Sequence, residues 1–320
     1  MKKLFSLIIP VYQNEDNLND TIPRCINFFK RIEEEYNYEF ILVNDGSTDK
    51  SLEILKKYQK LYPSSIKVIN LSKNFGQAMA IVAGLDYSKG DVVGVISADL
   101  QDPVELIQAM LSDWCSGYKL VIGERIKRND SFINNFFSTV FYKILRKYAV
   151  SNYPNGGFDF WVMDRIVVNE YLNIREKNVG IQMTILNLGF EYSVHPYERE
   201  KRLKGKSQYN FWKRIKNFYD AFLANSYTPI RAVSATGFIV SLGGFLYALF
   251  VIASWLLDPN PTHETRGWPT LVVLISIFSG FILIALGIIG EYIWRIYDEI
   301  RKTPLYVIKE TLDNTIVEEK

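Results

Sequence analysis

Two long stretches without a charged residue constrain the second half of this 320-residue chain. They are residues 232–257 and 268–289, joined by a short polar link, residues 258–267. A helix needs about 20 apolar residues to cross the hydrocarbon core of a bilayer, and both stretches are longer. We therefore predict two transmembrane helices. Basic side chains gather at the outer flanks, whereas the link has one Arg and two acids, which predicts that both termini lie in the cytoplasm.

Small residues recur at a spacing of four in each apolar stretch. Gly237 with Ser241, and Ser276 with Gly280, give faces on which two helices can pack closely.

The apolar stretches and their flanks predict a division of the chain into four parts. These are a cytoplasmic domain (1–210), a juxtamembrane amphipathic helix (211–231), the transmembrane hairpin (232–290), and a cytoplasmic juxtamembrane helix with a tail (291–320).

The first half of the chain alternates short apolar runs with segments of helical periodicity. The start resembles a signal peptide, but Pro10 interrupts the apolar run and a polar turn follows at once, which favours a strand. Strands alternating with helices predict an α/β fold with a mostly parallel, doubly wound sheet. The predicted strands are residues 5–11, 40–43, 66–71, 91–96 and 120–122.

The strand at residues 91–96 ends in a polar segment that carries candidate ligands. Open α/β sheets bind ligands at the carboxyl ends of their strands, and Asp99 and Gln101 offer a carboxylate and an amide oxygen to a hard cation carrying a diphosphate. The alternative is a helix start, with Asp102 as the N-cap and Pro103 in the first turn. The local pattern supports both interpretations equally.

Polar residues also follow the other predicted strands, among them Glu15, Asp45 and Gln77. A nucleotide base and ribose need hydrogen-bond acceptors such as Asp45. The alternative for Asp45 and Asp49 is turn and cap chemistry, with Gly46 supplying the turn.

Two further segments have two interpretations each. The aromatic-rich segment 132–148 predicts a helix that faces either the core or lipid. Asp159 lies among aromatic residues, as a site residue or as a buried acid paired with Arg165. His195, in a predicted strand at 191–196, receives no role.

Residues 199–216 carry eight basic side chains, and an apolar stripe continues through Phe222. This pattern predicts a helix at the membrane interface that is attracted to anionic lipids. The net charge of the whole chain is only +2, which excludes a strongly basic nucleic-acid binder. Cys25 and Cys115 have no metal-ligand spacing and are interpreted as reduced thiols.

Several of these stretches occur together in one protein family. The chain resembles the family 2 glycosyltransferases, and within them the polyprenyl-phosphate group of dolichol-phosphate mannose synthase and the bactoprenol glucosyltransferases. The resemblance covers nearly the whole chain. It rests on residues 9–12 (IPVY), 43–49 (VNDGSTD), 74–77 (NFGQ), 98–103 (ADLQDP), 157–160 (GFDF), 163–165 (MDR), 204–209 (KGKSQY) and 290–293 (GEYI) with Arg295 and Tyr297.

The resemblance implies a glycosyltransferase A-type fold and the transfer of a sugar from a nucleotide-diphosphate sugar to polyprenyl (undecaprenyl) phosphate, with inversion. It further implies Mg²⁺ or Mn²⁺, contact with membrane lipids at the cytoplasmic membrane, and a homo-oligomer. Its site residues fall into four groups: catalytic Asp159, Asp99 and Arg125; nucleotide-sugar-binding Pro10, Tyr12, Glu15, Asp45, Gln77, Ala98 and Asp99; acceptor-phosphate-binding Arg128, Ser138, Arg202, Lys204 and Ser207; and metal-binding Asp99 and Gln101.

The chain departs from the family pattern at one position of the metal motif. The usual Asp-Ala-Asp is Ser97-Ala98-Asp99 here, so a hydroxyl replaces one expected carboxylate. This departure sustains an alternative function, a catalytically weak membrane scaffold that binds nucleotide sugars. A processive polysaccharide synthase is a second alternative, but it would need more spans and a Gln-x-x-Arg-Trp signature, which the sequence lacks.

Overall fold

The computed structural model describes residues 2–99, 101–126, 153–154, 157–174, 180–198, 228–257, 267–301 and 303–313. The chain divides into two compact units, Met1–Ala221 with Pro304–Lys320, and Phe222–Thr303. The predicted aromatic helix at 132–148, the basic segment from 199 and most of the polar link lie outside the described residues.

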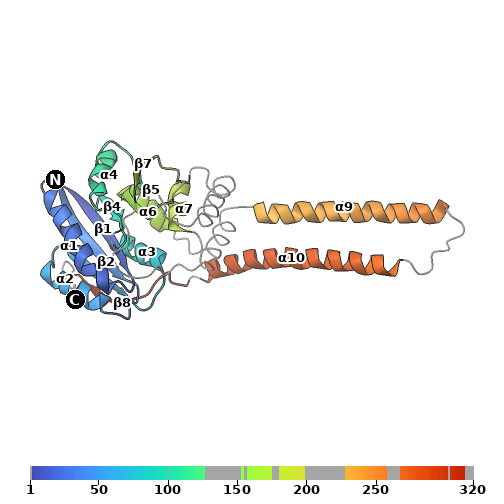
Figure 1. Cartoon of the computed structure of the whole chain (residues 1–320), viewed down its shortest axis with the longest axis horizontal. Coiled ribbons are helices and arrows are strands. Elements are labelled where there is room, and N and C mark those ends of the chain that lie inside the picture. The colour runs from blue at the N-terminus through green and yellow to red at the C-terminus, as the bar shows by residue number, and fades with distance from the viewer. Residues whose placement is uncertain are drawn as a thin grey trace. The chain divides into compact units, whose positions relative to one another are not determined.

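Within the described residues of the first unit, eight strands form one sheet in the order β7-β5-β6-β4-β1-β2-β3-β8 (Figure 1). β1 pairs in parallel with β2 and β4, β2 with β3, and β5 with β7; β6 and β8 pair antiparallel with their neighbours. The strands are β1 (Lys3–Val11), β2 (Tyr36–Asn44), β3 (Ile66–Leu71), β4 (Val92–Val95), β5 (Leu120–Arg125), β6 (Phe160–Asp164), β7 (Tyr192–Tyr197) and β8 (Ile308–Leu312).

Helices cover both faces of this sheet, which confirms the doubly wound, mostly parallel prediction. α1, α2 and α4 contribute to one buried cluster, whereas α3, α6 and α7 contribute to the cluster on the other face. Their bounds are α1 (Glu15–Arg31), α2 (Ser51–Leu61), α3 (Gln77–Tyr87), α4 (Leu106–Cys115), α6 (Arg165–Ile174) and α7 (Ile181–Asn187).

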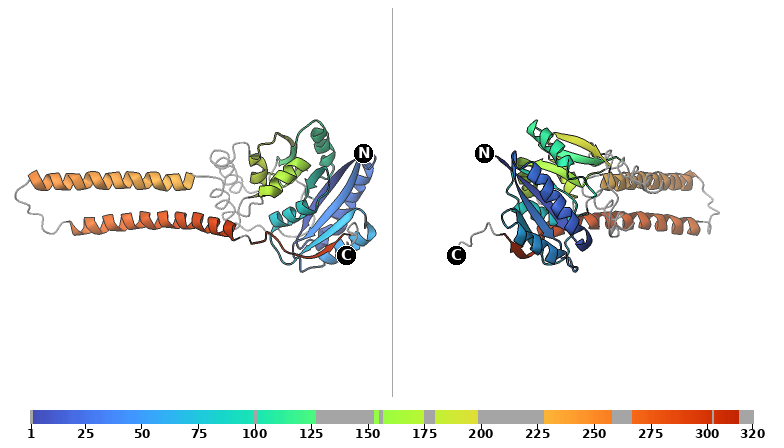
Figure 2. Two further views of the ribbon diagram at one scale, coloured as in Figure 1. Left: turned by 180° about the vertical axis from the view of Figure 1, so that it is seen from behind. Right: turned by 60° about the vertical axis from the view of Figure 1, so that its left-hand side comes forward.

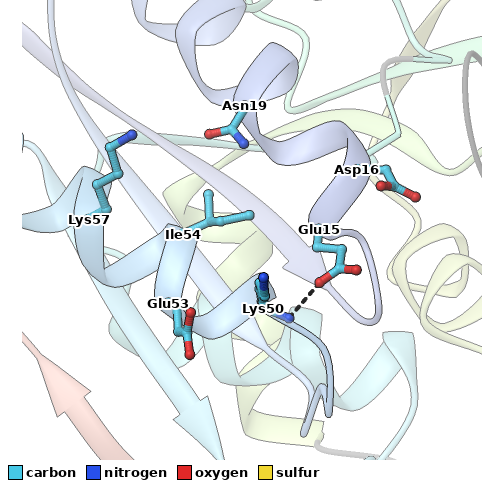
Figure 3. Close-up of a pocket in the computed structure, with 7 residues that line it drawn as sticks. All are labelled: Glu15, Asp16, Asn19, Lys50, Glu53, Ile54 and Lys57. Atoms are coloured by element: carbon cyan, nitrogen blue, oxygen red, sulfur yellow. Dashed lines mark hydrogen bonds between the residues drawn. The ribbon is translucent and has the colours of Figure 1, made fainter.

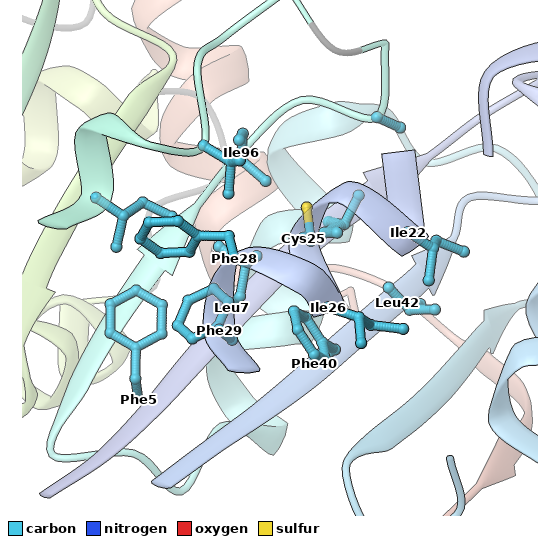
Figure 4. Close-up of a cluster of buried hydrophobic side chains, with 14 of the residues drawn as sticks. Phe5, Leu7, Ile22, Cys25, Ile26, Phe28, Phe29, Phe40, Leu42 and Ile96 are labelled. Carbon is cyan, nitrogen blue, oxygen red and sulfur yellow. The ribbon is translucent and has the colours of Figure 1, made fainter. Parts of the chain in front are cut away.

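The packing of α1 shows how the sequence pattern produces the layers. Leu18, Ile22, Cys25 and Phe29 recur every three or four residues and are all buried against the sheet. Phe29 packs edge-on against Phe40 of β2, with ring centroids 5.4 Å apart (Figure 4). Burying a large apolar side chain contributes about 1.5–3 kcal/mol, so this stripe holds α1 on the sheet.

The strands predicted from the sequence are all present, with somewhat different ends, but four elements were missed. These are β6 with the helix α6 that follows it, α7, and the C-terminal strand β8. One predicted helix start is wrong, because α4 begins at Leu106 and its N-cap is Glu105. Pro103 lies before the first turn of that helix.

β8 attaches the C-terminal segment to the outer edge of β3. The buried Lys67 Nζ lies 2.8 Å from Glu39 and 3.6 Å from Asp313, just after β8. Lys56 forms a second ion pair with Glu310 at 2.7 Å. Tyr306 donates a hydrogen bond to Asp86 at 2.6 Å. A chain segment far from β3 in the sequence therefore completes its side of the sheet.

The second unit contains the helices α9 (Thr228–Leu257) and α10 (Trp268–Ile300), which run side by side (Figures 1 and 2). Among the described glycines of these helices, the close approach is not at the predicted Gly237 or Gly280. A Cβ added at Gly237 or Gly280 would meet nothing within 4 Å, whereas one at Gly244 would lie 3.3 Å from the ring of Phe278. Of the glycines in the described parts of these helices, Gly244 is therefore the one that lies against the other helix.

Both predicted apolar stretches are helical. Large apolar side chains such as Phe238, Phe250 and Leu283 are more than two-thirds exposed. By length and composition, one segment of the described residues, Ile277–Ile300, is suited to cross a membrane, and Val233–Tyr247 is a shorter apolar helix. The number of spans and the orientation of the termini stay predictions.

Candidate active site

Polar residues converge at one edge of the sheet, where neighbouring parallel strands end. β4, β1 and β2 are adjacent, so the residues that follow them, Asp99, Tyr12 and Asp45, lie along the same edge. Pro10, within β1, pairs with Val43 of β2. The structure thus brings the predicted nucleotide residues to one side of the molecule.

Asp45 joins the end of β2 to the start of α3. Its carboxylate accepts hydrogen bonds from the backbone N–H groups of Phe75 at 2.7 Å and Gly76 at 3.0 Å. Burial raises the pKa of Asp45, and these two bonds oppose the rise. Gly46 is required beside it, because its φ is +66° and a Cβ would lie 2.3 Å from the backbone of Lys73. The turn interpretation is confirmed, and Gln77 opens α3 at the same place.

Glu15 and Asp49 fasten the start of α1 to the start of α2. Glu15 accepts a hydrogen bond from the N–H of Lys50 at 2.7 Å, and its own N–H donates to Asp49 at 3.1 Å. The other carboxylate oxygen of Asp49 accepts from Ser51 N–H at 3.0 Å, so Asp49 satisfies a backbone donor at the start of α2, whose N-cap is Lys50. Between the two helices lies an open cavity of about 440 Å³ (Figure 3). Glu15 is the one predicted nucleotide residue among those that line it.

The segment after β4 offers one carboxylate for a cation. Asp99 is buried, and its Oδ1 accepts the N–H of Gln101 at 3.3 Å. The carbonyl of Ala98 accepts a bond from Thr21 at 2.8 Å. Within the described residues, no group of three or more His, Cys, Asp and Glu side chains is arranged to hold a metal ion. A cation held by this segment would have Asp99 as its carboxylate ligand and would take most of its other ligands from phosphate and water, as Mg²⁺ commonly does.

Ser97, the hydroxyl that replaces an expected metal carboxylate, bonds another acid. Its Oγ donates to Asp102 Oδ2 at 2.5 Å, and Tyr197 donates to Asp102 Oδ1 at 2.5 Å. Asp102 is fully buried. The N-cap prediction for Asp102 is wrong, because the N-cap of α4 is Glu105. The two oxygens of Asp102 accept side-chain hydrogen bonds from Ser97, five residues earlier, and from the distant Tyr197.

Arg125 and Asp159 form an ion pair at the ends of β5 and β6. The Arg125 guanidinium donates to Asp159 Oδ2, and Gln182 Nε2 donates to Oδ1 at 3.3 Å. Burial alone would lower the pKa of Arg125, but the carboxylates of Asp159 and Asp102 raise it overall. The guanidinium is therefore a permanent positive charge.

The predicted pair between Asp159 and Arg165 is wrong. Arg165 instead donates to the carbonyl of Gly90 at 2.7 Å and to Ser88 Oγ at 3.0 Å. Three neighbours of the candidate catalytic residues are not indicated by any local pattern: Asp102, Gln182 and Tyr197. The alternation of Ser193, His195 and Tyr197 in β7 would have placed Tyr197 on one face of that strand, but it does not name a partner.

His195 lies on the face of β7 that meets α4. Its Nε2 is 2.8 Å from Asp113 Oδ2, which also accepts a bond from Ser193. These bonds join β7 to α4, so a structural role is sufficient for His195. The predicted acceptor residues Arg128, Ser138, Arg202, Lys204 and Ser207 lie outside the described residues.

Comparison with known proteins identifies the family. Residues 6–172, more than half of the chain, match the family described as Glycosyl transferase family 2. The chain belongs to this family. Membership confirms the family resemblance and identifies the first unit as a GT-A-like α/β domain of a transferase.

Two named relatives of this glycosyltransferase extend over nearly its whole length. The SfII prophage-derived bactoprenol glucosyl transferase of Shigella flexneri is 32% identical, covering 96% of this chain and 97% of the relative. The undecaprenyl-phosphate 4-deoxy-4-formamido-L-arabinose transferase of Proteus mirabilis is also 32% identical, over 96% and 93%. The chain is thus in the polyprenyl-phosphate group of the family that its motifs predict.

Similarity to a solved structure also extends over most of the chain. The mannosyltransferase PcManGT from Pyrobaculum calidifontis, in complex with GDP-Man and Mn²⁺, is 15% identical, covers 93% of this chain and 88% of its own, and has a TM-score of 0.49.

Proposed function

We propose that this glycosyltransferase transfers a sugar from a nucleotide-diphosphate sugar to a polyprenyl phosphate, with inversion, at the cytoplasmic face of a membrane. The observation that carries the proposal is the extent of the likeness to the two named transferases. It reaches 96% of the chain, so it extends beyond the catalytic sheet into α9 and α10. Both named relatives act on bactoprenol or undecaprenyl phosphate, and they differ in the sugar.

The donor is held at the carboxyl edge of the sheet. Pro10, Tyr12, Glu15 and Asp45 are the proposed nucleotide contacts, with Gln77 and Ala98 beside them. A divalent cation held by Asp99 and Gln101 would supply positive charge to the diphosphate. Arg125 adds a charge that the protein itself holds in place, since its guanidinium is fixed by Asp159. Fixed charges aimed at a departing diphosphate lower the barrier because they need no reorganisation during the reaction.

The acceptor does not require a strong base. A phosphate monoester with a second pKa near 6 is largely dianionic at pH 7, so it attacks the anomeric carbon without first losing a proton. Both oxygens of Asp159 already accept hydrogen bonds, from Arg125 and Gln182. We therefore assign Asp159 the role of holding Arg125 toward the diphosphate.

The membrane parts of the proposal concern the acceptor. Arg128, Ser138, Arg202, Lys204 and Ser207 bind its phosphate, and the segment 211–231 lies at the lipid headgroups. The helices at 232–290 anchor the protein and leave both termini in the cytoplasm. Binding at the membrane surface holds both reactants close together, which reduces the entropic part of the barrier. The active form is a homo-oligomer.

A transfer assay tests this function. The full-length protein in detergent is incubated with undecaprenyl phosphate, Mg²⁺ or Mn²⁺, and a panel of radiolabelled nucleotide sugars, and labelled lipid is counted. Asp99→Ala should reduce transfer by about 10²–10³-fold, the usual effect of removing one key electrostatic group. Asp20→Ala, on an exposed part of α1, is the matched control and should retain transfer.

The alternative of a weak nucleotide-sugar-binding scaffold is favoured by one observation, the bond that commits Ser97 to Asp102. The same assay separates the two functions. A protein that binds a nucleotide sugar in calorimetry but transfers none of the panel to lipid would refute the proposed enzyme and support the scaffold.

A further inference from the structure

Tyr197 lies where three parts of the candidate site meet. It ends β7, and in the parallel register of β7 with β5 it stands directly opposite Arg125. Its backbone carbonyl accepts the N–H of Ile126 at 3.0 Å, which fixes this register at its last position. Because register partners in a sheet place their side chains on the same face, the Tyr197 and Arg125 side chains project together.

The ring of Tyr197 packs against neighbours on two strands. It packs edge-on against Phe160 of β6, with ring centroids 6.1 Å apart. On β5 the neighbour is Gly123, where an added Cβ would lie 3.0 Å from Cε1 of the Tyr197 ring and 3.1 Å from Phe160. The absence of a side chain at Gly123 therefore provides the space in which the ring lies. Tyr197 as a whole is only 6% exposed.

This packing directs the Tyr197 hydroxyl toward two charged residues. The hydroxyl donates to Asp102 Oδ1 at 2.5 Å, and the Arg125 guanidinium, on the register partner of Tyr197, is its other charged neighbour. Burial raises the pKa of Tyr197, and the neighbouring Asp102 carboxylate raises it further, so the group remains a neutral hydroxyl at physiological pH. A neutral hydroxyl offers one proton and two lone pairs. The proton is given to Asp102, so the lone pairs are available to the neighbouring guanidinium.

We propose that Tyr197 is a positioning residue for sugar transfer, which fixes the Arg125 guanidinium between Asp102 and Asp159. Asp159 holds Arg125 from the β6 side. The Tyr197 hydroxyl holds Arg125 from the β7 side and is itself fixed by its hydrogen bond to the buried Asp102. The guanidinium is thus restrained from both sides, which is the preorganisation that stabilisation of a leaving diphosphate requires. Tyr197 acts through Arg125 and need not touch substrate.

Tyr197→Phe is the direct test, because it removes only the hydroxyl. Ser97→Ala is the matched comparison: it removes the other donor to the same Asp102 carboxylate, while the bond it removes does not involve Arg125. We expect similar falls in melting temperature for the two variants. Turnover, kcat, should fall about 10- to 100-fold for Tyr197→Phe, the range of a hydrogen bond to a charged group. The fall should be clearly smaller for Ser97→Ala, with little change in the KM for the nucleotide sugar in either variant.

A second measurement does not depend on catalysis. The rate at which phenylglyoxal modifies Arg125, followed by mass spectrometry, should rise in Tyr197→Phe and stay at the wild-type rate in Ser97→Ala. The turnover effect rests on the proposed function, whereas the reactivity of Arg125 does not. A wild type that transfers no sugar would therefore refute the function and leave the positioning role to be decided by reactivity.

The result that overturns the proposal is an Arg125 reactivity that is the same in Tyr197→Phe and in the wild type. Equal kcat values for Tyr197→Phe and Ser97→Ala in an active protein would overturn it as well. If Tyr197→Phe does not fold, Gly123→Ala replaces it. That variant keeps the hydroxyl but displaces the ring by its new Cβ, and it should raise the reactivity of Arg125 in the same direction.

Discussion

Asp159→Asn separates two roles for the carboxylate that holds Arg125. Asparagine keeps the shape of the side chain and one oxygen for Arg125, but it removes the negative charge and any ability to act as a base. If Asp159 positions Arg125, the variant weakens one charge-assisted bond. If Asp159 is a general base, the variant abolishes proton transfer to the protein.

The structure sets the expected size of the effect. A hydrogen bond to a charged group contributes about 1.5–3 kcal/mol, and 1.36 kcal/mol corresponds to tenfold in rate. The Asp159 side chain is 38% exposed, so solvent screens the pair, while the Arg125 side chain is 12% exposed and keeps its neighbours Tyr197 and Asp102. We therefore take the lower part of the range and expect kcat to fall about 10- to 30-fold. Loss of a general base typically costs about 10²–10⁴-fold.

The assay is kcat for sugar transfer to a short-chain polyprenyl phosphate in detergent, measured from about pH 5 to pH 9, the range in which catalytic acids and bases are usually detected. For a positioning role the acid side of the profile keeps its shape, since it reports the acceptor phosphate, and the whole curve moves down. Gln182→Leu removes the weaker partner of Asp159 and should cost less than Asp159→Asn. A profile that loses its acid limb in Asp159→Asn, with a fall beyond 10³-fold, would refute our reasoning and restore the base.

Three further predictions concern the metal, the topology and the acceptor. Ser97→Asp should tighten Mn²⁺ binding about tenfold by adding a second carboxylate. It should also lower the melting temperature of the metal-free protein, because the new charge lies beside the buried Asp102. An unchanged Mn²⁺ titration would contradict this prediction. A cysteine that replaces Thr262 should react with an impermeant thiol reagent added to whole cells, whereas a cysteine that replaces Thr315 should not. The reverse labelling would overturn the predicted orientation. Arg202→Ala with Lys204→Ala should raise the KM for polyprenyl phosphate about tenfold or more, with a much smaller change for the nucleotide sugar; an acceptor KM equal to wild type in detergent would leave both residues as surface charge.

The parallel half of the sheet was predictable because each of its strands can be recognised from its own residues. β1 to β4 are buried on both faces, so they read as short apolar runs, and each ends in turn residues. Polar groups at the ends of adjacent parallel strands must share an edge. The convergence of Asp45 and Asp99 therefore followed from the strand pattern alone.

The remaining contacts depend on pairings between distant segments. Arg165 is close to Asp159 in the sequence, but the strand β6 lies between them and places them at opposite ends. Arg125 reaches Asp159 because β5 and β6 pair antiparallel, with Gly123 opposite Phe160. No local pattern specifies that register.

Asp102 shows the same limit in a different form. An Asp before a Pro is a common helix start, and local chemistry favoured a cap. In the structure, Asp102 is instead fully buried and accepts hydrogen bonds from the hydroxyls of Ser97 and Tyr197. A buried acid needs such partners, but the sequence does not reveal which residues provide them.

The place of β8 in the chain determines the order in which this protein can be assembled during translation. The ribosome finishes β1 to β7 first, then α9 and α10, and only afterwards the strand Ile308–Leu312. Until then the outer edge of β3 carries unpaired backbone groups, and Lys67 lacks the Asp313 carboxylate. A nascent chain that stalls within α10 therefore exposes an open sheet edge. The catalytic domain can close that edge only after both long helices have been synthesised.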